Sequence, residues 1–186
     1  MVTGMYADGI AMSEIGDDWD MNTDNFDGRP LTYVMRDSVE FGHNLKQAVD
    51  LVKDGPRTTS LLYCISSAAD KKVRALQTSH AQCKVYSPST LPFPTQKGLV
   101  YMSMGMDSKW NAKVGAALKK DYGSLSVHDA ESLMHDLKTG SLHAVVFKPG
   151  TGDVWVANAT ATEKAYNEPF NHFNLKEALS DPFFGK

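Results

Sequence analysis

Two neighbouring stretches decide the fold of this chain: Gly28-Arg-Pro-Leu-Thr-Tyr-Val-Met-Arg-Asp37 and Gly55-Pro-Arg-Thr-Thr-Ser-Leu-Leu-Tyr63. From Leu31, and again from Leu45, apolar residues recur at helical spacing, which predicts two consecutive helices. After the second turn the residues become β-branched and aromatic, so we expect a strand over residues 58–65. The first Gly and Pro turn therefore predicts the start of a helix pair, and the second predicts the end of this pair and the start of a strand.

The rest of the chain alternates antiparallel hairpins with helices. The expected hairpins cover residues 2–15, 58–78 and 142–157, with an extended piece at 82–86, and the later helices cover 108–122, 126–137 and 174–180. The residues expected to cap helix N-termini are Asn44, Ser108, Ser126 and Asn174. Helix pairs placed between hairpins indicate sheets covered by helical layers, so the predicted class is α+β. A length of 186 residues fits a single domain over residues 1–186.

Composition excludes several functions. The net charge of -3 supplies no basic stripe for a phosphate backbone, so we expect no nucleic acid partner. No apolar run approaches the roughly 18 residues that cross a bilayer, so no membrane span is expected. The two cysteines do not have the spacing of metal ligands, and we expect neither a metal nor an organic cofactor. The compartment stays open, since the glycosylation tripeptide that starts at Asn158 is common by chance.

Residues 16–28 form an acidic segment rich in Asp, Asn and Gly. This composition predicts an exposed loop between the first hairpin and the first helix. The segment does not have the ligand spacing or the closing Glu of an EF-hand calcium loop. We therefore interpret it as a connection and not as a calcium site.

The order of these motifs resembles a known family. Beside the two Gly and Pro turns, the matching segments are residues 2–14, 142–147, 154–158, 169–170 and 173–179. Together they resemble the acyl-CoA:6-aminopenicillanic acid acyltransferase-like hydrolases, which belong to the N-terminal nucleophile superfamily. The resemblance implies a four-layer αββα sandwich of antiparallel sheets. It also implies hydrolysis or acyl transfer on a linear amide, with a small-molecule amide or acyl compound as substrate.

The resemblance also implies where the nucleophile should be. In that superfamily the first residue supplies the attacking atom, and its free α-amino group is the general base. This chain begins with Met1, and its first hairpin resembles a motif that lies several strands after the nucleophile. We therefore expect an upstream segment that carries an N-terminal Cys, a fold that is incomplete at its N-terminus, and a catalytic residue outside residues 1–186.

Three residues are predicted to bind substrate from this resemblance. Tyr6 and Leu62 stand where many relatives have Asn, whose amide helps to hold a substrate carbonyl, and a donor there is worth roughly 3 kcal/mol in the transition state. Arg57 belongs to the second turn and could hold a substrate carboxylate. The alternative for Arg57 is a structural role, with bonds to backbone carbonyls or to Asp37 or Asp54.

Two alternatives to the hydrolase prediction stay open. One is a non-catalytic homologue of the same fold that binds a small acyl compound or a partner protein, and the other is an unrelated α+β domain. Cys64 is expected to be a small buried hydrophobe on a central strand, and the closeness of His80 to Cys83 is expected to be incidental. Without upstream strands the 2–15 hairpin would leave an open sheet edge, so a homo-oligomer is among the expected assemblies.

Overall fold

The computed structural model describes residues 3–103, 105–106 and 109–183. The chain forms two compact units, residues 1–115 and 116–186. Each unit has its own antiparallel sheet, and the boundary between them falls within helix α3 (Lys109–Lys120). The units are described one at a time below.

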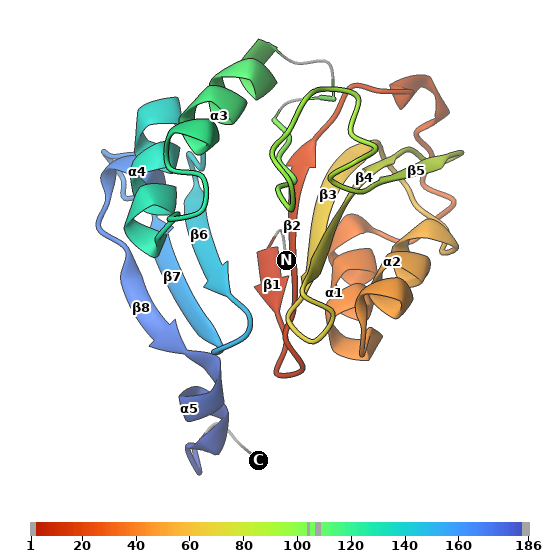
Figure 1. The fold of residues 1–186 in the computed structure, drawn as a ribbon. Helices are drawn as coiled ribbons and strands as arrows, with labels where there is room; N and C mark the ends of the chain where they lie inside the picture. The colour runs from red at the N-terminus through yellow and green to blue at the C-terminus, as the bar shows by residue number, and fades with distance from the viewer. Residues whose placement is uncertain (1–2, 104, 107–108, 184–186) are drawn as a thin grey trace. The chain divides into compact units, whose positions relative to one another are not determined.

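Unit 1 is built on a five-stranded sheet in which every neighbouring pair is antiparallel (Figure 1). Its strands follow the order of the chain: β1 (Thr3–Met5), β2 (Ile10–Gly16), β3 (Leu61–Ser67), β4 (Lys72–Thr78) and β5 (Cys83–Tyr86). In the register of the three central strands, Leu62 lies between Ile15 of β2 and Gln77 of β4. Their side chains therefore share one face of the sheet.

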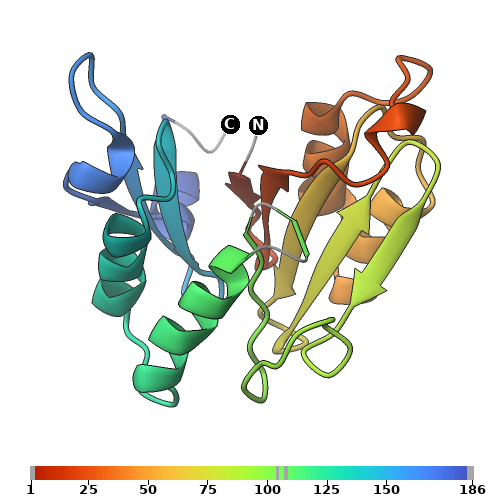
Figure 2. The ribbon, with the colours of Figure 1, turned by 90° about the horizontal axis from the view of Figure 1, so that it is seen from above.

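Helices α1 (Leu31–Phe41) and α2 (Leu45–Lys53) cover the opposite face of this sheet (Figures 1 and 2). Their apolar positions are buried against alternate residues of the central strands, which forms the main core. That core includes Val34, Met35, Val39, Ala48 and Val52 from the helices and Met12, Tyr63, Ile65 and Leu76 from the strands. Asn44 begins α2, because its side chain accepts a hydrogen bond from the backbone N–H of Gln47.

The face that carries Leu62 has a second, smaller core. Leu62 and Ala75 pack with Met106, and partly buried residues of the segment after β5 complete the cluster, among them Leu91, Phe93, Val100 and Met102. A long connection between β5 and α3 is therefore fixed to the sheet by its apolar side chains.

Unit 2 contains a three-stranded antiparallel sheet: β6 (His143–Lys148), β7 (Asp153–Asn158) and β8 (Asn171–Asn174). Helix α4 (Val127–Leu137) packs against β6 and the short helix η2 (Ala165–Asn167), and α5 (Leu175–Ser180) follows β8 (Figure 2). Ser126 and Asp129 form a complete capping box at the start of α4. Small residues make the core of this unit, since Ala144, Ala157 and Ala165 are buried together.

The predicted α+β class and the antiparallel hairpins are confirmed: the described residues form five α-helices and two antiparallel sheets. The expected strand at 58–65 is wrong at its start, because β3 begins at Leu61. Strand β8 and the short helices η1 (Met21–Thr23) and η2 were not predicted. The start of the first hairpin at Val2 and the expected cap Ser108 lie outside the described residues. The four-layer sandwich and the single domain stay predictions.

Candidate functional site

The two Gly and Pro turns of the sequence lie side by side in unit 1. Arg29 and Arg57 form a parallel β-bridge, and the backbone N–H of Arg29 donates to the carbonyl oxygen of Pro56 at 3.2 Å. A Cβ atom on Gly28 would lie 2.5 Å from the carbonyl oxygen of Arg57, so only glycine fits this close approach. We call this pairing of residues 28–30 with residues 55–58 the turn junction.

Arg57 holds the turn junction together. Its side chain is buried, with the residue 7% exposed, and its Nε donates to the carbonyl oxygen of Ser79 at 2.9 Å. Its Nη1 lies 2.8, 2.7 and 2.9 Å from the carbonyl oxygens of Val52, Lys53 and Gly55, which share the two hydrogens of this group. These acceptors include carbonyl groups of the last turn of α2, which have no partner within the helix. Arg57 therefore makes the backbone contacts that the sequence offered as its structural alternative.

The acidic loop is fixed to the same region through its carboxylates. Asp24 accepts hydrogen bonds from the hydroxyls of Thr59 and Ser60 at 2.8 and 3.0 Å. Asp20 accepts one from the hydroxyl of Ser79 at 2.8 Å. Strand β3 begins at Leu61 because its partners end there: Leu61 pairs with Gly16, the last residue of β2, and with Thr78, the last residue of β4.

A cavity of about 460 Å³ opens beside the turn junction. Its walls come from the acidic loop, the start of α1 and the segment before β3, and they consist of Asp24, Asn25, Phe26, Pro30, Leu31, Thr32, Thr58 and Thr59. Phe26 is 99% exposed, so it borders the cavity without being packed. Apolar walls with a few hydroxyl groups suit an acyl chain or another apolar ligand of moderate size.

The three residues predicted to bind substrate are not brought together. Tyr6 lies in the turn between β1 and β2, where its backbone pairs with Ile10, and it is 42% exposed. Leu62 is fully buried and lies opposite Ile15. Ile15 is five residues after Ile10 along β2, which is roughly 17 Å at the usual rise of a strand. Arg57 is committed to backbone carbonyls. Their roles in substrate binding stay predictions.

Sequence reasoning missed a carboxamide beside Leu62. Gln77 is the cross-strand neighbour of Leu62 on the same face, and it is buried. Its Nε2 donates to Asp17 Oδ2 at 2.9 Å, and its Oε1 accepts from the hydroxyl of Tyr86 at 3.3 Å. The alternation of side chains along β4 could have indicated which face of the sheet carries Gln77. Only the pairing register with β3 shows that Gln77 is the neighbour of Leu62.

Neither cysteine is an activated nucleophile. Burial raises the pKa of Cys64 to about 11, although the residue keeps some exposed surface. Burial also raises the pKa of Cys83, against a smaller opposite effect of Arg57. The ring of His80 is engaged within the turn junction, where its Nδ1 lies 2.6 Å from the carbonyl oxygen of Arg57. Among the described residues, no group of three or more His, Cys, Asp and Glu side chains could hold a metal ion.

At the level of the chain trace, the fold of this protein is similar to that of a solved hydrolase. The comparison is with a mutant of the conjugated bile acid hydrolase from Clostridium perfringens, whose crystal structure matches with a TM-score of 0.57 over 95% of this chain and 73% of that chain. The sequence identity is 9%, so the likeness concerns the fold. No family model matches the sequence.

Two curated relatives from Dictyostelium discoideum also match. They are Protein dcd1A, 20% identical over 170 residues, and Protein dcd1B, 20% identical over 177 residues. The matches cover 87% and 83% of this chain but only 38% and 35% of the two relatives. The chain thus spans little more than a third of the length of these relatives. In the described part of the chain, no helix has the length and apolar character to cross a membrane.

Proposed function

We propose that this chain is part of an amide hydrolase or acyltransferase that acts on linear amides. In this proposal a Cys on a segment upstream of these residues attacks the amide carbonyl, the amine leaves, and water or a second amine releases the acyl group from the thioester. The acyl-CoA:6-aminopenicillanic acid acyltransferase-like family remains the proposed family.

The observation that carries the proposal is the fold likeness to a conjugated bile acid hydrolase, a protein whose name states hydrolysis. The high pKa of Cys64 supports a nucleophile elsewhere, because fewer than about one Cys64 thiol in a thousand is ionised at pH 7.5 when its pKa is about 11. The much greater length of the two curated relatives agrees with a role as one part of a larger protein.

The cavity beside the turn junction is the proposed acyl site. Leu31, Pro30 and Phe26 give it apolar walls, while the hydroxyls of Thr58 and Thr59 already bond to Arg29 and Asp24 within the protein. Because these two hydroxyls are engaged within the protein, the cavity favours an apolar acyl chain over a sugar or a nucleotide.

A non-catalytic acyl-binding homologue is the second candidate. The buried Leu62 favours it, since an apolar side chain at that position cannot donate a hydrogen bond to a substrate carbonyl. The adjacent Gln77 has a carboxamide on the same face, and its Nε2 has a second N–H beside the one bonded to Asp17, which keeps catalysis as the first candidate.

Amine release from N-acyl amino acids of increasing acyl length tests the proposal in the whole protein. The informative variant is Thr32→Trp, because Thr32 is exposed, lies at the start of α1 and lines the cavity. We expect this variant to slow hydrolysis of long acyl chains roughly tenfold or more, by occupying their space, and to leave short chains nearly unchanged.

Tyr33→Trp is the matched control, since Tyr33 is the next residue of α1, is exposed and does not line the cavity. An unchanged dependence on acyl length in Thr32→Trp would reject the cavity as the acyl site. Saturable acyl binding with no release of amine from any substrate would reject catalysis and favour the acyl-binding homologue.

A further inference from the structure

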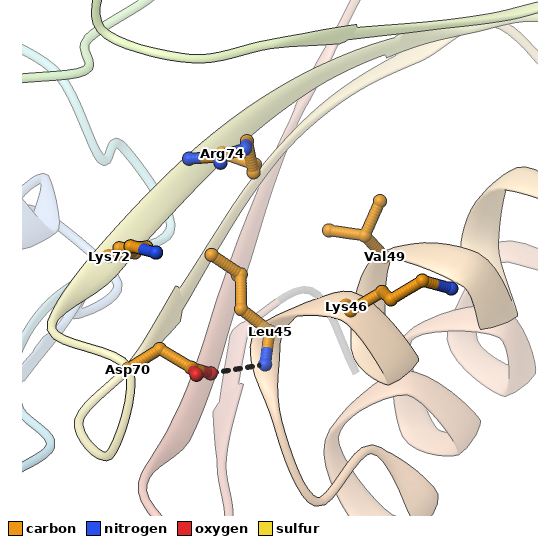
Figure 3. A pocket seen from close by; sticks show the side chains of 6 residues that line it. All are labelled: Leu45, Lys46, Val49, Asp70, Lys72 and Arg74. Carbon is orange, nitrogen blue, oxygen red and sulfur yellow. Dashed lines mark hydrogen bonds between the residues drawn. The ribbon is translucent and has the colours of Figure 1, made fainter.

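A second cavity lies in unit 1 between α2 and β4, and it is lined by charged residues (Figure 3). Its volume is about 240 Å³. Leu45, Lys46 and Val49 of α2 line one side, and Asp70, Lys72 and Arg74 line the other (Figure 3). Nothing in the proposed amide chemistry uses this cavity, so its function is a separate question.

The floor of the cavity is apolar. Leu45 and Val49 belong to the main core and are buried, and both lie across from β4 in Figure 3. Lys72 and Arg74 are two residues apart on β4, so their side chains lie on the same face of the strand. The cavity therefore joins an apolar surface to a pair of cations.

The charges that are free to meet a ligand can be counted from the ion pairs. Lys46 Nζ lies 2.5 Å from Asp50 Oδ2 and is directed away from β4, so this lysine is neutralised (Figure 3). Among the described residues, no carboxylate lies within ion-pair distance of Lys72 or Arg74. Arg74 uses Nη1 for the carbonyl oxygen of Val73 at 2.8 Å, which leaves most of its guanidinium donors available.

Asp70 is the one acid in the cavity wall, and its carboxylate is already engaged. It accepts from the backbone N–H of Leu45 at 2.7 Å and from the hydroxyl of Ser67 at 2.8 Å. The bond from Leu45 has the largest effect in lowering the pKa of Asp70, and the bond from Ser67 and the charge of Lys72 lower it further, so Asp70 stays ionised at neutral pH. Two cations and one anion leave a charge of +1 at the cavity, which matches a monoanion better than a dianion.

We propose that this cavity binds a small organic carboxylate, with the carboxylate between Lys72 and Arg74 and its apolar body against Leu45 and Val49. A guanidinium binds a carboxylate through a planar fork, and a neighbouring ammonium adds charge without fixing geometry. Protection of a sheet edge would also explain the two cations, since β5 pairs only with residues 75–78 of β4. Leu45 and Val49 belong to the main core in either case, so binding of a carboxylate that depends on its charge is what distinguishes the two roles.

Calorimetric titration of the full chain with hexanoate tests the proposal, with hexanamide as an uncharged probe of the same shape and inorganic phosphate as an anion without an apolar body. We expect saturable binding of hexanoate, and binding of hexanamide and of phosphate that is at least about tenfold weaker. Binding of hexanoate should weaken as salt is raised, because the cations are partly exposed.

The variants Lys72→Gln and Arg74→Gln should each weaken hexanoate binding, Arg74→Gln by about tenfold or more. Lys119→Gln is the control, because Lys119 is an exposed lysine of α3 that does not line the cavity. If Arg74→Gln does not fold, Lys72→Gln carries the test, since Lys72 is an exposed residue at the strand end. Equal binding of hexanoate and hexanamide, or undiminished binding in the Lys72 variant, would overturn the proposal.

Discussion

At the scale of single residues, Arg57 shows how a motif residue can belong to the architecture. Its guanidinium joins the end of α2, at Val52 and Lys53, to Ser79 beyond β4. The same residue contributes the backbone that closes on Gly28. Arg57 therefore need not contact substrate, because its N–H groups already donate to backbone carbonyls of segments that are distant in sequence.

Replacing Arg57 by lysine tests this structural role. Lysine keeps the charge, but a single ammonium cannot reach carbonyl groups on both sides of the junction, so buried acceptors lose their donors. We expect Arg57→Lys to lower the free energy of unfolding by about 2 kcal/mol in urea denaturation. The control Arg36→Lys changes an exposed residue paired with Glu40 and should have a much smaller effect. Equal effects in the two variants would contradict the structural role.

Asp153 is expected to govern part of the acid stability of unit 2. Its carboxylate accepts from Thr151, Asn174 and His172, and these bonds lower its pKa to about 2. Because the pKa is lower in the folded state than in the unfolded chain, this stabilisation is complete above about pH 4 and is lost as pH falls toward 2.

Thermal unfolding of the wild type and of Asp153→Asn at pH 6 and at pH 2.5 measures this contribution. The difference in melting temperature between the two proteins should be clear at pH 6 and should shrink at pH 2.5, where the wild-type carboxylate begins to take up a proton. The same difference at both pH values would show that the charge of Asp153 does not stabilise the fold.

At the scale of elements, the contact between α1 and α2 depends on Gly42. A Cβ atom there would collide with the carbonyl oxygen of Ser38 and would lie 2.7 Å from Cβ of Ala48. The helices approach each other closely at this point, and Ser38 also donates its hydroxyl hydrogen to the carbonyl oxygen of Ala48 at 2.9 Å. The glycine is needed for space, since its φ of -86° is open to other residues.

Gly42→Ala should therefore destabilise the protein, by about 2 kcal/mol from overpacking. The matched control is Gly16→Ala, since no heavy atom lies within 4 Å of a Cβ built at Gly16. We expect the control to be neutral or slightly stabilising, because alanine restricts the unfolded chain. Urea denaturation of both variants gives the comparison, and a neutral Gly42→Ala would mean that the helices separate easily at this point.

Sequence reasoning predicted the elements whose signals are local. The helix starts at Asn44 and Ser126 were predicted from capping residues, and both side chains make the expected bonds. Strand β8 was missed because Asn171–Asn174 is short and polar and becomes a strand by pairing with β7. The bonds of Arg57 and the place of Gln77 beside Leu62 were out of reach, since both depend on the register of segments distant in sequence.

At the scale of the whole molecule, the proposed function divides the chemistry between this chain and a nucleophile outside it. The fold likeness to a hydrolase concerns most of the chain, while its own thiols have raised pKa values. The cavity at the turn junction offers room for an acyl group. In this proposal residues 1–186 supply binding and framework, and the attacking atom belongs to the upstream segment.

Mass spectrometry of the acylated protein can locate the nucleophile. The whole protein is allowed to react with an activated acyl ester at pH 7.5, digested, and searched for the acylated peptide. We predict a single adduct at an N-terminal Cys upstream of this chain, with Cys64 and Cys83 unmodified because burial keeps their thiols protonated. An adduct on Cys64 or Cys83 would contradict the proposal, since this chain would then carry its own nucleophile.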